Sequence, residues 1–173
     1  MLKSAGALVT GAASELLPAT DEGSVVAAAM RSLRDRYNES TRALILRKGE
    51  RLRIAAAEGP FAAELAARGP DEIAASLVGA CIVGQRLLNV RDARRDPRFV
   101  RAALAIRSQI CVPLVAGDQV LGALSLESPY AGAFAETDEG ELAAVAQLVA
   151  LAISHTRLHA KRSRDLAELH AIT

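Results

Sequence analysis

Four polar or reactive side chains occupy alternate positions on two neighbouring predicted strands. They are Gln109 and Cys111 on the first strand, and Ser125 and Glu127 on the second. Alternate residues of a strand point to the same face of a sheet, so an amide, a thiol, a hydroxyl and a carboxylate should share one face. These groups donate and accept hydrogen bonds. Together with Arg107, at the start of the first strand, they can hold the polar groups of a small molecule.

Nucleophilic and metal chemistry have less support in the sequence. A cysteine reacts as its thiolate, and Cys111 lies within an apolar strand, where we expect a packed thiol. His155 and His159 have a helical spacing that can hold a metal, but no third ligand is evident in the sequence. We therefore expect a solvated helix surface at the histidines, and we name no cofactor.

The two strands are predicted from alternating patterns over residues 107–115 and 119–127. Their even positions are mostly apolar, as at Ile110 and Leu124, whereas the odd positions carry the polar groups towards the strand ends. The even face should therefore pack against a hydrophobic core.

A three-residue loop over 116–118 would keep odd residues opposite odd residues, as the shared face requires. This register places Gln109 opposite Ser125 and Arg107 opposite Glu127. It predicts a cross-strand ion pair between Arg107 and Glu127.

The remaining elements follow from periodicity and from turn residues. We expect helices over 2–17 and 24–36, a hairpin over 43–59 with its turn at 48–50, short helical pieces over 60–77 broken at Gly69-Pro70, a strand over 87–90 and a loop over 92–99.

A final helix should run from about Thr137 to about His170, because no glycine or proline stops it after Gly140. Such a helix is roughly 50 Å long, which exceeds what a domain of this size can cover. Its end should project and pair with a second copy or lead into another domain, although Arg162 and Asp165 interrupt its apolar stripe. A frayed, solvated tail is the alternative.

Composition limits the classes of function. The 173 residues suffice for one domain with a proper core, and a net charge of +1 gives no reason to expect nucleic-acid or membrane binding. Cys81 and Cys111 lack metal-site spacing, so we expect reduced cysteines in a cytoplasmic protein. The N-terminus has the spacing of an amphipathic helix rather than that of a signal peptide.

The order of the elements resembles that of a GAF domain, over about residues 20–156. The likeness rests on the segments Leu77-Val78-Gly79, Val90-Arg91-Asp92-Ala93, Asp96-Pro97-Arg98-Phe99, Arg107-Ser108, Val112-Pro113-Leu114, Leu121-Gly122-Ala123-Leu124 and Phe134-x-x-x-Asp138. The resemblance implies an α+β, GAF/PAS-like fold. A central antiparallel sheet has terminal helices packed on one face and pocket-covering helices and loops on the other. The resemblance also divides the chain into an N-terminal helix (1–20), the GAF domain (20–156) and a projecting linker helix (157–173).

The same resemblance implies a small-molecule pocket on the odd face of the sheet. The expected ligand-binding residues are Arg107, Gln109, Cys111, Ser125 and Glu127, with Asp92, Arg98, Phe99 and Tyr130 around the rim. A polar sheet face without a ligand is the alternative.

Members of the family with a more specific function need particular residues, and most of these are absent from this chain. Members that bind cyclic nucleotides carry Asn-Lys where this chain has Glu127-Ser128, and bilin-binding members use a Cys-His pair that is absent. Members that reduce free methionine sulfoxide need a cysteine in the loop before the first strand of the hairpin. The segment 98–107 has none. On these grounds we expect no enzymatic activity, with a reductase as the least favoured alternative.

The leading hypothesis is a regulatory module that binds an unidentified small molecule. It would act through its terminal helices in a homodimer and would belong to a longer signalling protein with an output domain. The second hypothesis is a ligand-free dimerisation and spacer module, with its pocket filled by apolar side chains.

Overall fold

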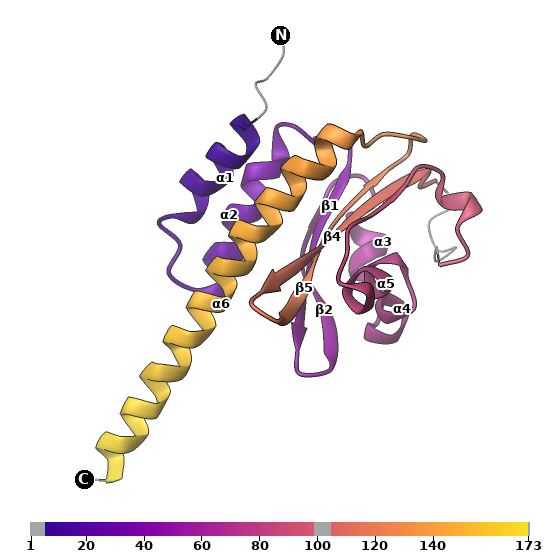
Figure 1. The fold of residues 1–173 in the computed structure, drawn as a ribbon. Coiled ribbons are helices and arrows are strands. Elements are labelled where there is room, and N and C mark those ends of the chain that lie inside the picture. Colours follow the sequence, from indigo (N-terminus) through magenta and orange to yellow (C-terminus); the bar gives the residue numbers. More distant parts are fainter. Residues whose placement is uncertain (1–5, 99–104, 173) are drawn as a thin grey trace.

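A five-stranded antiparallel sheet with the order β2-β1-β5-β4-β3 forms the centre of the molecule. The computed structural model describes residues 6–98 and 105–172, and it places helices on both faces of the sheet (Figure 1). The strands are β1 Thr41–Lys48, β2 Arg51–Glu58, β3 Leu88–Val90, β4 Ser108–Ala116 and β5 Gln119–Ser128. The predicted α+β fold class is confirmed.

The even face of the sheet packs against the three longest helices, α1 Ala7–Leu16, α2 Glu22–Arg34 and α6 Glu136–Ile172 (Figure 1). Asp21 caps α2, because its carboxylate accepts from the Ser24 amide at 2.7 Å while Ser24 Oγ accepts from the Asp21 amide. Ile110 and Leu124 are buried beneath these helices. The assignment of the even positions to the core is therefore correct.

Three short helices cover the odd face: α3 Ala62–Ala66, α4 Pro70–Ala74 and α5 Leu77–Gly84. The break between α3 and α4 lies at Gly69-Pro70, as predicted. The sequence did not predict α5 as an element of its own. Its residues are nearly all apolar and most are buried, so they show no helical alternation of apolar and polar positions.

The β4–β5 register differs from the prediction. Gln109 lies opposite Glu127 and Cys111 lies opposite Ser125. The turn has two residues, Gly117 and Asp118, and a bulge leaves Leu121 without a partner on β4. The short turn alone would place odd residues opposite even ones, and the extra residue restores the shared faces. The polar groups therefore share one face as predicted, but a two-residue turn with a bulge produces this arrangement instead of a three-residue loop.

The last helix, α6, has 37 residues and is therefore about 55 Å long. Its last buried residue is Thr156, and every residue described after Arg157 is exposed (Figure 1). The prediction that the helix projects is correct. Within the described residues, no helix is long and apolar enough to cross a membrane.

Candidate functional site

Three of the predicted site residues form one hydrogen-bonded group on the odd face. Gln109 Nε2 donates to Ser125 Oγ at 3.0 Å and lies 3.5 Å from Cys111 Sγ, while Cys111 Sγ lies 3.6 Å from Ser125 Oγ. All three side chains are buried. The strand alternation therefore brings an amide, a thiol and a hydroxyl together, as the sequence predicted.

The fourth residue, Glu127, lies beside this group without a hydrogen bond of its own. Its carboxylate is only 1% exposed, and neither oxygen has a hydrogen-bond partner among the described residues. Burial raises the pKa of Glu127 to about 7, although the nearby Arg68 guanidinium acts in the opposite direction. A buried carboxyl group without hydrogen bonds is costly and is common in functional sites.

Arg68 is a site residue that sequence reasoning missed. Its Nη1 lies 3.7 Å from Glu127 Oε1, and its Nε has no partner among the described residues. Arg68 stands between α3 and α4, just before the Gly69-Pro70 break, in a stretch with no chemical motif. Only the packing of α3 and α4 on the sheet brings this charge to Glu127. We call Gln109, Cys111, Ser125, Glu127 and Arg68 the odd-face cluster.

The thiol of Cys111 is fully buried, and burial raises its pKa well above the ordinary value. Burial likewise raises the pKa of Cys81 to about 12. Both cysteines are free, and both are protonated at neutral pH. Cys111 is therefore a packed thiol in this structure, as expected.

The other predicted residues do not join the cluster. Arg107 does not meet Glu127, and its predicted ion pair is wrong. With the observed register, Arg107 Nη2 instead lies 3.6 Å from Asp92 Oδ2. Arg98 binds the carboxylate of Asp96, with Nε and Oδ1 2.9 Å apart. Tyr130 is 62% exposed.

Ser108 Oγ donates to the carbonyl oxygen of Tyr130, which fixes the chain there rather than the tyrosine ring. Phe99 lies outside the described residues. The ligand-binding role of all these rim residues stays a prediction.

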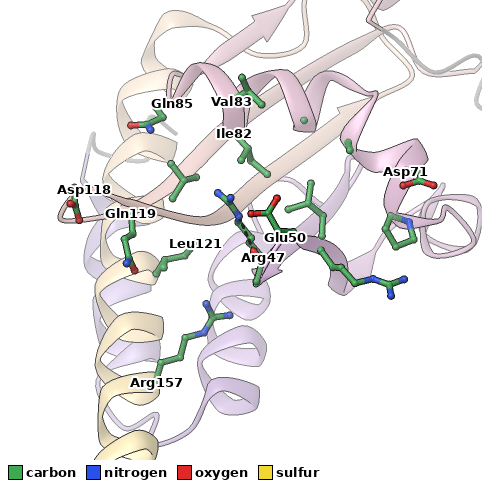
Figure 2. A pocket seen from close by; sticks show the side chains of 17 residues that line it. Arg47, Glu50, Asp71, Ile82, Val83, Gln85, Asp118, Gln119, Leu121 and Arg157 are labelled. Atoms are coloured by element: carbon green, nitrogen blue, oxygen red, sulfur yellow. Dashed lines mark hydrogen bonds between the residues drawn. The ribbon is translucent and has the colours of Figure 1, made fainter.

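A cavity of about 940 Å³ lies at the hairpin end of the sheet, apart from the odd-face cluster. Figure 2 shows side chains of the β1–β2 and β4–β5 hairpins, α5 and α6 around it. Leu52, Ile82 and Val120 supply apolar surface to this space and also belong to the hydrophobic layer of the odd face. This cavity was not predicted, because it arises only when the two hairpin tips meet α5.

Arg157 lines this cavity at the point where α6 leaves the sheet (Figure 2). Its Nε donates to Glu22 Oε2 at 2.9 Å, and Arg53 Nη2 donates to Glu22 Oε1 at 2.9 Å. Hydrogen bonding from Arg157 is the main cause that lowers the pKa of Glu22. The start of α2, strand β2 and the exit of α6 are thus joined by one carboxylate.

The described residues contain no group of three or more His, Cys, Asp or Glu side chains that could hold a metal ion. The rings of His155 and His159 lie 6.5 Å apart on the projecting helix, and both residues are exposed.

Solved structures with the same fold include GAF domains and enzymes. The GAF domain of an Acinetobacter phosphoenolpyruvate-protein phosphotransferase has a TM-score of 0.78 and 16% identity, covering 93% of this chain and 99% of its own. A putative GAF sensor protein from Burkholderia vietnamiensis has a TM-score of 0.74 and 20% identity, covering 88% and 94%. No curated protein sequence matches the chain.

The free methionine-R-sulfoxide reductase of Neisseria meningitidis, solved with its substrate, is as similar to the chain as the Burkholderia protein is. It has a TM-score of 0.74 and 20% identity, covering 90% of this chain and 91% of its own. A reductase from Staphylococcus aureus also has a TM-score of 0.74. Our expectation that the chain is not an enzyme is contradicted by these neighbours, because the same fold serves enzymes and an enzymatic function is plausible.

The sequence also matches the family model of the GAF domain over residues 20–153. This range contains all five strands and the odd-face cluster, and it ends within α6. The chain belongs to the GAF domain family.

Proposed function

We propose that this chain is the sensory or regulatory module of a signal-transduction protein and binds a small polar molecule at the odd-face cluster. The observation that carries the proposal is the Glu127 carboxyl group, which is 1% exposed and lacks any hydrogen-bond partner among the described residues. A buried polar group without a hydrogen-bond partner typically costs about 1–3 kcal/mol of stability. A ligand that donates hydrogen bonds to Glu127 would remove that cost.

The neighbouring groups narrow the chemistry of the ligand. Gln109 and Ser125 present an amide and a hydroxyl beside the carboxylate, and Arg68 adds a positive charge whose Nε is also without a partner. Leu77 and Ala123 contribute apolar surface on the same side of the sheet. A compact molecule with N–H or O–H donors and an acceptor group fits these partners.

Transmission would run from the sheet to α6, which packs on the opposite face of β4 and β5. We propose that two copies associate through their terminal helices and that the segment 157–173 links the module to an output domain of a longer protein. The ligand can shift such a system only if it binds two helix arrangements with different affinities. The division into 1–20, 20–156 and 157–173 is part of this proposal.

A ligand-free dimerisation and spacer module is the second candidate. It is favoured by the close packing of Leu65, Ile73 and Val78 over the odd face. In this case Glu127 would stay without a hydrogen bond, and no small molecule would stabilise the protein through it.

A thermal-shift screen of small hydrogen-bond donors at pH 8 tests the proposal. A true ligand should raise the Tm of the wild type but not that of Glu127→Gln. Glu50→Gln is the matched control, because Glu50 is exposed and lines the hairpin-end cavity instead. A compound that stabilises wild type and Glu127→Gln equally would contradict a site at the odd-face cluster.

Free methionine sulfoxide belongs in the same screen, because structural neighbours of the chain reduce it. Its consumption in the presence of a thiol reductant would assign an enzymatic role. Loss of that activity in Glu127→Gln, but not in Glu50→Gln, would place the reaction at the odd-face cluster.

A further inference from the structure

The projecting part of α6 carries an unpartnered stripe with the spacing of a coiled coil. Leu158, Arg162, Asp165, Leu169 and Ile172 follow one another at alternating steps of four and three residues. This spacing places them on one face of the helix. The three apolar members of the stripe are between 62% and 83% exposed.

Four charged residues of the segment that follows Arg157 have no ion-pair partner within the described chain. This holds for Arg162 and Asp165 in the stripe, and for Lys161 and Glu168 beside it. A coiled-coil position filled by a charge is stabilised only when the partner helix supplies the opposite charge. The pattern of charges therefore restricts which helix can cover the stripe.

From this pattern we infer that the stripe binds the same segment of a second copy in the antiparallel orientation. If Arg162 lies opposite Asp165 of the second copy, the two-fold symmetry places Asp165 opposite Arg162 of that copy. The same alignment places Leu158 opposite Leu169 of the second copy, and Leu169 opposite its Leu158. Leu158 thus meets Leu169 and each charge meets its opposite, while Ile172 lies opposite His155 of the second copy.

The flanking positions agree with this alignment. In an antiparallel pair, Lys161 and Glu168 of the second copy lie on the same side of the seam and about 3 Å apart along the axis. Symmetry repeats this pair at the other end of the overlap. The parallel orientation would instead place Arg162 opposite Arg162 and Asp165 opposite Asp165, which is unfavourable.

The helix is already formed before it pairs, because its N-terminal half packs on the sheet of its own domain. Binding therefore avoids most of the cost of ordering a free peptide. The two domains would lie at opposite ends of the paired segments. The inference rests on the proposed dimer and adds its surface and orientation.

Cysteine cross-linking tests the orientation. In the antiparallel pair the two Leu158 positions are about 16 Å apart along the axis, beyond the reach of a disulfide. Leu158→Cys alone should therefore give no covalent dimer under mild oxidation, whereas a mixture of Leu158→Cys and Leu169→Cys should give one. The wild type is the control, because both native cysteines are buried.

Each other outcome has a distinct meaning. Efficient cross-linking of Leu158→Cys with itself would overturn the antiparallel orientation and retain the dimer. A dimer in native mass spectrometry without cross-links in the mixture would place the interface elsewhere and overturn the inference. A monomer would contradict both the inference and the proposed dimer, while leaving ligand binding at the odd-face cluster to its own test.

Charge reversal tests the pairing independently. Arg162→Asp and Asp165→Arg should each weaken self-association roughly tenfold or more, because each brings like charges together. A mixture of the two variants should associate again, since one supplies two negative and the other two positive charges. Arg164→Asp changes the charge on a different face of the helix and should leave association unchanged. An equal loss in Arg164→Asp would show a general charge effect and overturn the pairing.

Discussion

The two faces of the central sheet are built from the same strands but differ in what they bury. The even face carries residues such as Ile110 and Leu126 and is covered by three long helices. The odd face carries Gln109 and Glu127, which are equally buried, beneath three short helices. The even face is thus built for stability, whereas the odd face also buries polar groups, among them a carboxyl group without a hydrogen-bond partner among the described residues.

The largest expected effect concerns the bulge that keeps the two faces distinct. Gly122 has a φ of +153°, and an added Cβ would lie 2.0 Å from the carbonyl oxygen of Ile45. We expect Gly122→Ala to cost about 4–5 kcal/mol or to prevent folding, because strain and overpacking add. Denaturant unfolding measures this cost.

Gly117→Ala is the matched control. Gly117 also has a positive φ, +63°, but an added Cβ would have no described atom within 4 Å. Gly117→Ala should lower the free energy of unfolding by only about 1–2 kcal/mol. Equal losses for the two variants would show that backbone conformation alone, rather than the close approach of β1, sets the requirement for glycine.

Two neighbouring residues of β5 compare the faces directly. Leu126→Ala should cost about 3 kcal/mol, because it leaves a cavity beneath the long helices. Ser125→Ala should cost about 1 kcal/mol, because Gln109 loses one hydrogen-bond acceptor. Denaturant unfolding of the two variants measures these losses. A larger loss for Ser125→Ala would mean that the odd face, rather than the even face, supports the fold.

The pH dependence of stability isolates Glu127. Its folded pKa of about 7 lies above the ordinary glutamate value, so the folded state retains a proton that the unfolded state has lost. Stability should therefore fall by about 2–3 kcal/mol as the pH rises from about 4.5 to about 7. Glu22 and Glu58 have pKa values below the ordinary glutamate value. Any change in stability that they cause therefore occurs below about pH 4.5.

Glu127→Gln should remove this fall. Thermal unfolding at pH 5 and pH 8 should show equal stability of variant and wild type at the lower pH, and a more stable variant at the higher pH. A parallel decline in both proteins would assign the pH dependence to other groups.

The smallest effect is expected for a surface ion pair between two of the helices that cover the even face. Arg31 Nε lies 2.8 Å from Glu15 Oε2 and joins α2 to α1, but both side chains are more than 40% exposed. Arg31→Gln should change the free energy of unfolding by less than about 1 kcal/mol, because solvent weakens such a pair. A loss of several kcal/mol would show that α1 is held mainly by this contact.

The assignment of residues to the two faces was predictable because strand alternation is a local property. It placed Gln109, Cys111 and Ser125 together without knowledge of the register. Two features of the sequence indicate the true register: Gly117-Asp118 suits a two-residue turn, and Gly122, a glycine inside a strand, is typical of a bulge. The prediction instead used a three-residue loop without a bulge, and so placed the partners of β4 two residues out. The pairing of Arg107 with Asp92, instead of Glu127, follows from that difference.

Arg68 and the hairpin-end cavity needed the tertiary structure for a different reason. Arg68 meets Glu127 only because α3 and α4 pack on the odd face. The cavity forms where hairpin tips and α5, distant in the sequence, come together. Contacts of this kind depend on how elements are arranged in space, which residue spacing does not encode.

Native mass spectrometry of freshly purified protein, beside its denatured mass, tests the central claim that the odd-face cluster binds a small molecule. The account predicts an excess mass on the wild type that disappears on denaturation, is retained in Glu50→Gln and is absent from Glu127→Gln. The same excess mass on Glu127→Gln would contradict this claim. So would the absence of any excess mass on all of these proteins, even when they are saturated with the best compound of the screen.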